Sequence, residues 1–514
     1  MSPLSTGSNY RAWLQSHRLL FAFALFTALL LRLWIALHFA HEAGDTPGYD
    51  ALAENMLRYH VFSWDSPESL SPTDARAPGY PLFLAAIYTL AGMKNHTAVR
   101  VTEAILDTSL LFWITWLAWE IFPASAGVVL ILAALQPFTA EYTAAVLTET
   151  CTIVLATIAL LTMLIGYKHR SLKAWFFCGM AIAVAILCRP DCIMLIASAA
   201  VLLLALIRRS EGVKKSSTLE ACAPKPSEPR SPEGVKKSEP RPLGSGPSDE
   251  SPLAYARGSV FSRTTAIRAA LFFAAGLALP WGPWVARNAI TLHRFQPLAD
   301  FYASQPDEFT PVGFIGWTRT WIKDDLYLDS VSWQVNEGKL DMHNFPAYAF
   351  DSEEERSRVE ALIMRYNEED EMTREIDREF AHIAQERIER HPLRYLIQLP
   401  FRRALMLWFS PHYRIFPLTE ELLPLRNLID DPLESVLVDL FFLSKLALVV
   451  LACVAVILLP DRLISLWAAL TILLRTAAFS WMPNVEYRYV LEVFPLLLVL
   501  GATGFLLLRM RKQP

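Results

Sequence analysis

Charged residues are scarce in this chain of 514 residues. Asp, Glu, Lys and Arg together make up 19% of the sequence, whereas hydrophobic residues make up 53%. This balance is too apolar for a soluble protein of this size and indicates a membrane protein that crosses the bilayer several times. The formal net charge is only -4, and we expect no nucleic-acid partner.

Cysteines are few, and none lies in a long loop predicted to face outward. Five of the six, Cys151, Cys178, Cys188, Cys192 and Cys453, fall in apolar runs or at their edges, and Cys222 lies in a polar linker. A disulfide framework is therefore not expected. The Cys188–Cys192 spacing resembles a metal motif, but no histidine stands near it, so it is a weak zinc signal.

Apolar runs long enough to cross a hydrocarbon core of ~30 Å recur along the chain. The first, 19–40, follows Arg11 and Arg18 and has no small-residue cleavage site after it, which predicts a retained first helix. The other runs are 98–121, 124–139, 142–166, 172–188, 190–207, 267–286, 437–459, 463–482 and 489–508. These runs predict an all-α bundle of about ten transmembrane helices.

Basic residues assign the two sides of this bundle. Lys168, Arg170, Arg208 and Arg462 fall in connections on the side of the N-terminus, as do the basic residues after 508. Because cytoplasmic loops are enriched in Lys and Arg, both termini are predicted to be cytoplasmic, in the cytoplasmic (inner) membrane. The connections 41–97 and 287–436 are then extracytoplasmic.

One apolar segment, 79–92, is too short to span the membrane. Counting it as a span would reverse the orientation of every later loop. We therefore predict a juxtamembrane helix on the outer surface, with Tyr80 and Tyr88 in the headgroup region.

The predicted organisation has five parts: an N-terminal transmembrane module 1–207 that includes the first outer loop, a linker 208–266, a helix 267–286, an outer segment 287–436 and a C-terminal module 437–514. The linker is rich in Pro, Ser, Lys and Glu and repeats EGVKKS at 211–216 and 233–238, which favours disorder. In the outer segment, charges alternate at helical spacing over 352–392. This pattern indicates a solvated amphipathic helix or helix pair lying over the spans, or a cover over an acceptor site.

Several charged residues stand at the outer ends of the predicted spans. They are Asp45, Arg76, Arg189, Arg287 and Arg488. Arginine is unexpected on this side of a membrane, so these residues favour an anionic partner such as a lipid phosphate. The alternative is that each one snorkels or has a structural role. Glu149 is predicted to be buried within the fourth span, where it has a structural hydrogen bond or a catalytic role.

Several short motifs, in their order along the chain, resemble those of a known family. Asp45 precedes Tyr49 by four residues, Arg76–Pro81 reads RAPGYP, Cys188–Asp191 reads CRPD, 280–288 reads PWGPWVARN, and EYRYVLEVFPLLLVL lies near the end. In this order the motifs resemble the GT-C glycosyltransferases, and most of all the group that uses polyprenyl-phosphate sugars and includes protein O-mannosyltransferases and lipid A aminoarabinose transferases. The resemblance covers the chain apart from the linker.

The resemblance implies an inverting transfer of a sugar from a polyprenyl-phosphate donor to a hydroxyl-bearing acceptor at the outer membrane face. The acceptor, a lipid, protein or glycan, is not specified. Asp45 matches the family's catalytic base, and Asp50 is the second choice. Partial desolvation at the membrane edge is expected to raise the basicity of this acid.

Substrate contacts are assigned to two kinds of side chain. Arg76 and Arg488 are expected to hold the leaving phosphate, with Arg287 third. The tyrosines expected to line the substrate site are Tyr49, Tyr80 and Tyr487.

The helix after Asp45 is predicted to start with Thr46 as its N-cap and Pro47 as its first residue. Asp50 and Glu54 are then one turn apart, solvated or paired with Arg58 unless Asp50 is the acid. Thr46 also stands where the mannosyltransferase relatives carry a second acid, and this departure leaves the sugar open.

No cofactor is expected to be required. The adjacent acids Asp324–Asp325 and Asp430–Asp431 stand far from the motifs. Metal-free transfer is favoured, and a divalent metal remains possible.

A second function class stays open. A transporter or flippase of a lipid-linked or anionic substrate has a similar number of spans and also carries intramembrane charges. The sequence shows no repeated halves with matching broken helices, which such proteins often have. A non-catalytic membrane scaffold would leave Asp45 beside the arginines unexplained.

Overall fold

The computed structural model describes residues 10–221, 263–300, 302, 308–335, 338–410, 413, 415–416, 418, 432–482 and 484–511. Within these residues the fold is helical, and strand pairing is limited to isolated bridges such as His41 with Ala145. Nine of the described helical segments are long and apolar enough to cross a membrane. The predicted all-α polytopic membrane architecture is confirmed.

The bundle contains ten apolar helices. They are α2 Arg18–His38, α5 His96–Ile121, α6 Ala126–Leu135, α7 Glu149–Lys168, α8 Leu172–Cys188, α9 Met194–Ala221, α10 Arg263–Thr291, α16 Pro432–Leu458, α17 Arg462–Ser480 and α18 Phe494–Arg511. The α8 helix, with 17 residues, is not among those nine segments and completes the predicted set, whereas the 10-residue α6 belongs to the longer apolar segment Pro123–Ala144. A short helix, α1 (Tyr10–Ser16), precedes them, and the 3-10 turns η2 (Ala140–Ala144), η3 (Pro190–Ile193) and η9 (Tyr487–Val493) interrupt the apolar runs.

Small residues let two helix pairs approach closely. A Cβ atom on Gly179 of α8 would overlap the carbonyl oxygen of Phe273 on α10, and one on Gly504 of α18 would overlap that of Leu451 on α16. Helices in lipid associate through such close packing, because lipid tails remove the hydrophobic driving force between them. The α8–α10 and α16–α18 pairs are therefore closely packed helix pairs of the bundle.

A buried ion pair ties three further helices together. Arg32 of α2 donates from Nε to Asp107 of α5 at 2.6 Å, and both side chains are fully buried. The same guanidinium donates to the carbonyl oxygens of Ala133 and Ala134 at 2.9 and 3.0 Å. Arg32 thus satisfies the end of α6 as well as Asp107.

We expect Asp107→Leu to lower the stability of the folded protein in detergent by about 3–5 kcal/mol, because Arg32 would keep a buried charge without its partner. The double variant Arg32→Met/Asp107→Leu should recover most of this loss. Thermal unfolding of the purified variants measures both effects, and a double variant as unstable as the single one would contradict this account.

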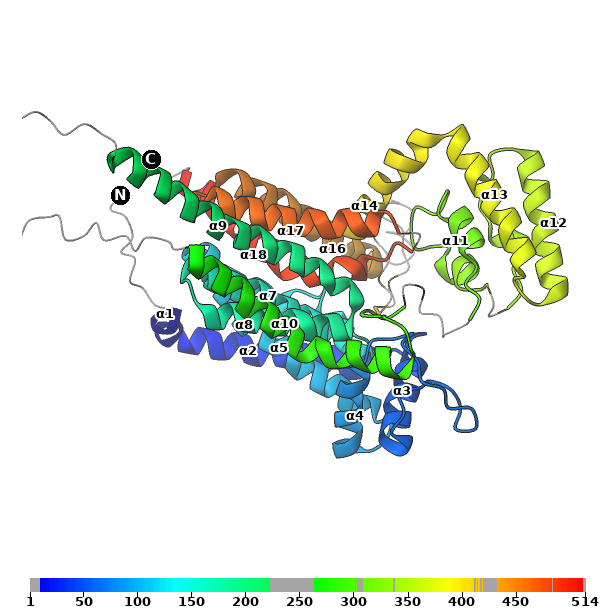
Figure 1. Ribbon diagram of the computed structural model, residues 1–514, viewed down its shortest axis with the longest axis horizontal. Helices are drawn as coiled ribbons and strands as arrows, with labels where there is room; N and C mark the ends of the chain where they lie inside the picture. Colours follow the sequence, from blue (N-terminus) through cyan, green and yellow to red (C-terminus); the bar gives the residue numbers. More distant parts are fainter. Residues whose placement is uncertain are drawn as a thin grey trace, which may run out of the picture.

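The two ends of the bundle differ (Figure 1). Helix α1, the C-terminal end of α18 and the start of α10 lie at one end, and the described connections between α2 and α5 and between α10 and α14 lie at the other. At this second end stand α3 (Thr46–Tyr59), α4 (Gly79–Ala91) and a projecting unit built from α11 (Val312–Thr318), α12 (Glu353–Glu369) and α13 (Arg374–Arg390). We call this second end of the bundle the polar end.

Helix α4 is the predicted short apolar helix, and it runs across the direction of the spans (Figure 1). Its tyrosines do not face outward as expected. Tyr80 and Tyr88 are buried and donate hydrogen bonds to Glu103 at 2.8 Å and Asp50 at 2.5 Å. Leucines such as Leu90 occupy the exposed face instead, because buried carboxylates on α3 and α5 need hydroxyl donors.

The projecting unit has a core of its own. Trp317 and Phe314 of α11 pack against Val359 and Ile363 of α12 and Phe380 of α13. The predicted helix pair over 352–392 is therefore present, but its apolar faces make this core rather than lying over the spans. Beneath the pair, Arg387 is buried and contacts Glu355 and Asp351.

The structure corrects one prediction about the linker. Helix α9 continues past Arg208 to Ala221, so the first EGVKKS copy lies in a helix. No proline occurs between Pro190 and Pro224, and Glu, Lys and Leu are compatible with helix. The second copy, Cys222 and Asp430–Asp431 lie outside the described residues.

Candidate active site

Asp45 is held at the polar end by backbone contacts on both sides. His41 donates from its backbone nitrogen to Ala144 at 3.0 Å, and the Thr46 hydroxyl donates to the carbonyl oxygen of Val146 at 3.3 Å. These contacts bind the chain before α3 to the segment before α7. Asp45 is thereby placed close to the start of α7.

The start of α3 differs from the prediction. Asp45 occupies the N-cap position, Thr46 is the first helical residue, and the cap makes no side-chain hydrogen bond. The Asp45 carboxylate turns instead toward Arg76, and the Thr46 hydroxyl toward Val146. Arg76 carries a full positive charge, so the Asp45 carboxylate pairs with it instead of accepting a hydrogen bond from a backbone nitrogen of α3.

Arg76 and Arg488 converge on Asp45. Arg76 donates from Nη2 to Asp45 Oδ1 at 2.9 Å, and Arg488 Nη1 lies 3.8 Å from Asp45 Oδ2. Arg76 also lies over the ring of Trp64, with 5.6 Å to its centroid. The structure therefore brings together Asp45, Arg76 and Arg488, although Arg488 lies 443 positions after Asp45 in the sequence.

Gly79 allows Arg76 to reach this position. A Cβ atom there would lie 2.6 Å from the backbone of Leu187 and 2.8 Å from that of Cys188. Only a glycine lets the start of α4 pack so closely on the end of α8. The Pro-Gly turn of RAPGYP therefore fixes Arg76 beside the CRPD turn.

A second layer of charge lies behind Asp45. Arg488 contacts Glu486 at 2.9 Å and Glu149 at 3.4 Å, and Glu149 is bound by Arg189 at 2.8 Å. Glu149 is the first residue of α7, so it lies at the end of this helix and not within it as predicted. Its two arginine partners give it a buried structural role.

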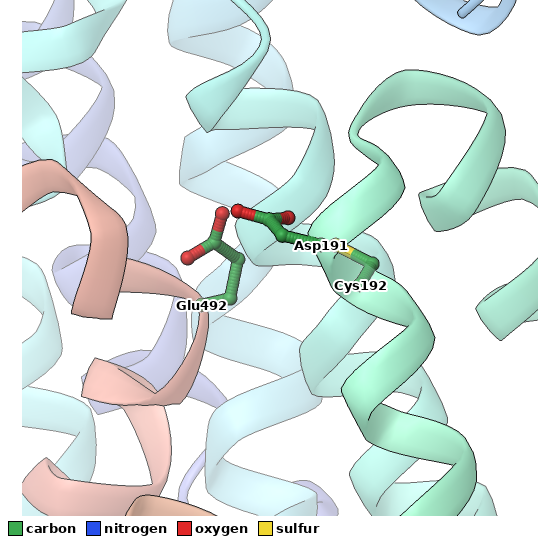
Figure 2. Close-up of side chains that lie close together, drawn as sticks. All are labelled: Asp191, Cys192 and Glu492. Carbon is green, nitrogen blue, oxygen red and sulfur yellow. The ribbon is translucent and has the colours of Figure 1, made fainter. Parts of the chain in front are cut away.

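The deepest layer joins Arg189 and Arg475 to two more carboxylates. Arg475 contacts Asp191 at 3.1 Å and Glu492 at 2.6 Å, and Arg189 contacts the same two residues at 3.2 and 3.5 Å. Figure 2 shows Asp191 from η3 and Glu492 from η9 turned toward one another, with Cys192 beside them. We call the nine residues of all three layers the charged cluster: Asp45, Arg76, Glu149, Arg189, Asp191, Arg475, Glu486, Arg488 and Glu492.

The Asp191, Cys192 and Glu492 ligand atoms lie within 4.8 Å of one another, which would suit a metal ion. Two guanidiniums already contact both carboxylates, however. A cation added there would meet two positive charges at contact distance. The donor set of this group therefore fits ion pairing better than a metal.

Exposure falls from the front of the cluster to the back. The side chains of Asp45 and Arg76 are 33% and 24% exposed, Arg488 is 15% exposed, and Glu492 is fully buried. Asp45, Arg76 and the edge of Arg488 are therefore the accessible part of the charged cluster. The deeper residues hold those three in place.

The ionisation of Asp45 corrects another expectation. Burial alone would raise its pKa, but the guanidiniums of Arg76 and Arg488, with Arg189 further away, hold the pKa below the usual range of an aspartate. Asp45 is therefore ionised in the resting protein and is a weaker base than predicted. Its basicity rises only if another anion engages the arginines.

The remaining predicted residues lie outside direct reach of Asp45. Arg287 donates to the carbonyl oxygens of Thr73 and Phe62 at 2.8 and 3.5 Å, and so holds the loop that carries Arg76. Tyr49 and Tyr80 are buried with their rings in an edge contact at 5.1 Å. Tyr487 is buried and donates to Glu141 at 2.8 Å.

Asp50 has partners that the sequence did not suggest. It is neither solvated nor paired with Arg58, because Tyr88 donates to one of its oxygens and His96 Nε2 lies 2.8 Å from the other. Glu54 does pair with Arg58, at 3.1 Å, and also with Lys94 at 2.8 Å. Asp50 thus joins α3 to α4 and α5.

Arg475 and Glu492 are the cluster members that sequence reasoning missed. Each is a charged residue in an otherwise apolar run, TILLRTAAF and YVLEVFPLLL. Ionisable residues inside transmembrane segments are rare and face the bundle interior, so this was a usable signal. The pairing itself had no local signature, because Arg475 and Asp191 are 284 residues apart.

Comparison with known families supports the resemblance. The model of a family described as dolichyl-phosphate-mannose-protein mannosyltransferase matches residues 75–221, which include Arg76, Glu149, Arg189 and Asp191. No curated protein matches the chain. Together with the helical architecture, the family match supports the resemblance of this chain to the GT-C membrane glycosyltransferases.

Proposed function

We propose that the protein transfers a sugar from a polyprenyl-phosphate carrier to a hydroxyl-bearing acceptor at the extracytoplasmic membrane face, with inversion at the anomeric carbon. The observation that carries this proposal is the convergence of a partly exposed carboxylate, Asp45, with the guanidiniums of Arg76 and Arg488. A transferase of this kind needs a base for the acceptor and fixed cations for the departing phosphate.

In the proposed reaction, the acceptor oxygen forms a bond to the anomeric carbon while its proton passes to Asp45. The bond from that carbon to the phosphate oxygen breaks, and its electron pair leaves with the carrier. The phosphate therefore gains negative charge as it departs, and Arg76 and Arg488 stabilise that charge. Tyr49, Tyr80 and Tyr487 are buried and would shape the site from behind.

The guanidiniums also explain why we propose transfer without a metal. The charge that a divalent ion would supply at the leaving group is already available from two arginines fixed by Asp45, Glu149 and Glu486. Donor binding would draw Arg76 away from Asp45. The base would then regain its proton affinity when the donor is in place.

The description of the matching family names a mannose donor and a protein acceptor. A hydroxyl of a protein side chain is therefore the acceptor to try first, with lipid and glycan hydroxyls next. We further propose that the polar end faces outward, because Lys168, Arg170 and the C-terminal basic residues belong to the opposite end.

Membranes that contain the protein, with empty membranes as the control, test the proposal. They are supplied with a panel of polyprenyl-phosphate sugars labelled in the sugar and with hydroxyl acceptors. The expected result is free polyprenyl phosphate in equal amount to new glycoside. Movement of an intact labelled donor across the membrane, without release of the carrier, would instead indicate a flippase.

The acid side of the pH profile gives a further prediction. Because Arg76 and Arg488 hold the pKa of Asp45 low, kcat/KM of the wild type should stay flat down to below the usual aspartate range. Arg76→Gln removes one cation but leaves the burial, so its acid limb should move to higher pH by about one unit. Identical acid limbs in both proteins would contradict this assignment of the base.

A further inference from the structure

Two arginines at the junction between the bundle and the projecting unit lack acidic partners. Arg403 lies in α14 (Leu399–Phe409) and is 1% exposed, and Arg319 follows the last residue of α11. Arg403 donates to the carbonyl oxygens of Ile322 and Arg319, at 2.7 Å and 2.5 Å from Nη2. In the part of the chain that the structure describes, neither arginine forms an ion pair with a carboxylate.

Arg403, with the half-buried Arg319 beside it, differs from other buried arginines of the described residues. Arg32, Arg387 and Arg475 each contact an aspartate or glutamate. Burial, reinforced by the positive charge of Arg319, lowers the pKa of Arg403 to about 10, so Arg403 still carries its charge at neutral pH. Buried positive charges are costly unless an anion balances them. The junction is therefore short of one negative group.

Arg319 is fixed by aromatic rings and left with hydrogen-bonding capacity. Its guanidinium carbon lies 5.5 Å from the ring centroid of Tyr395 and 5.8 Å from that of Trp481. Its Nε is buried and has no hydrogen-bond partner. Trp481 directly follows α17, and Tyr and Trp at the ends of spans mark the depth of lipid headgroups.

An exposed apolar stripe runs beside the pair. It consists of Leu393, Leu396, Ile397, Phe401 and Leu405, each between 43% and 65% exposed, on the π-turn η8 (Arg394–Gln398), on the residue before it and on α14. Helix α14 packs on α17, where Trp408 donates to Thr476 at 3.0 Å. Figure 1 shows α14 at the end of the bundle, between α17 and the projecting unit. The stripe therefore continues the apolar surface of the spans past their polar end.

We propose that Arg319, backed by Arg403, binds the phosphate of a membrane lipid whose hydrocarbon chain lies along the Leu393–Leu405 stripe. Arg319 contacts the phosphate, and Arg403 behind it adds positive charge to the site. A soluble anion would satisfy the arginines but not the stripe, which favours a lipid. The phosphate belongs to a bulk phospholipid or to an isoprenyl phosphate, and the site is separate from the charged cluster.

Thermal unfolding of the full chain in detergent tests this proposal. Dioleoylphosphatidylglycerol and an isoprenyl phosphate are titrated separately, with dioleoylglycerol as the lipid that lacks phosphate. The expected result is saturable stabilisation by at least one phosphate lipid and none by dioleoylglycerol. Arg319→Gln should raise the lipid concentration for half-maximal stabilisation about tenfold or more, the worth of one charge-assisted hydrogen bond.

Matched variants separate the outcomes. Arg358→Gln removes an arginine of the projecting unit that pairs with Glu386 at the surface, and should bind lipid as the wild type does. Arg319→Lys should retain part of the affinity. A response to phosphatidylglycerol that Arg319→Gln weakens supports a bulk phospholipid, and the same loss with isoprenyl phosphate alone supports the carrier.

Other results overturn the proposal. Equal stabilisation by dioleoylglycerol, no stabilisation by either phosphate lipid, or an undiminished response in Arg319→Gln each rules out the site. Isoprenyl-phosphate stabilisation that survives Arg319→Gln but is lost in Arg76→Gln belongs to the charged cluster. Stabilisation by phosphatidylglycerol does not depend on sugar transfer. A failure of this proposal is therefore distinguishable from a failure of the proposed function.

Discussion

Asp45→Asn should slow sugar transfer strongly while leaving binding of the lipid carrier intact. General-base catalysis contributes about 10²- to 10⁴-fold to such reactions, and we expect a loss of turnover in this range. The asparagine keeps the size of the side chain but cannot take the acceptor proton. It also frees Arg76 and Arg488 from a competing carboxylate, so isoprenyl phosphate should bind as tightly as before or more tightly.

The measurement combines single-turnover transfer with equilibrium binding of isoprenyl phosphate to the same preparation. Glu54→Gln is the matched control, because Glu54 lies on the same helix and pairs with Arg58 and Lys94 away from the cluster. It should retain full turnover. Normal transfer by Asp45→Asn would remove Asp45 from the chemistry and direct attention to Asp50, whose bonds to Tyr88 and His96 would then need another explanation.

Arg488→Gln should give the second large effect, on both binding and turnover. Loss of a fixed donor that stabilises developing charge costs about 10²- to 10³-fold in kcat. Arg488 contacts the carboxylates of Glu486 and Glu149 as well as approaching Asp45. Its removal therefore takes away a leaving-group cation and also loosens the deeper pairs.

Arg488→Lys separates these two consequences. Lysine keeps the charge but not the planar fork that binds several oxygens, so turnover should fall less than in the glutamine variant. Carrier binding and thermal unfolding are measured beside turnover. If Arg488→Gln lowered only the unfolding temperature, with kcat per folded molecule unchanged, Arg488 would be a structural residue and not a ligand of the phosphate.

The helices were predictable because long apolar runs and loop charges are local features. The short helix α4 and the helix pair of the projecting unit were expected for the same reason. The contacts of Asp50 with Tyr88 and His96 were not, because they join three helices through single side chains. A local sequence pattern records which face of a helix is apolar, but not which distant residue a buried polar group meets.

The candidate site shows the same division. Asp45, Arg76 and Arg488 were singled out by residue type and position, and the structure brings them together. The low pKa of Asp45 could not be foreseen, since it depends on how closely two arginines approach. Arg287 stands near a helix terminus at the polar end like Arg488, yet it holds a loop. Only the packing of α10 on that loop separates the two arginines.

The pairing within the charged cluster also has a consequence for how the protein assembles in the membrane. The N-terminal module already contains Arg189 with Glu149, and the C-terminal helices already contain Arg475 with Glu492. Each half can therefore neutralise its own charges during insertion, before α17 and α18 meet α7 and the start of α9. The contact between Arg475 and Asp191 closes only when the halves dock. We therefore expect that two separately synthesised halves, each with charge partners of its own, complement each other.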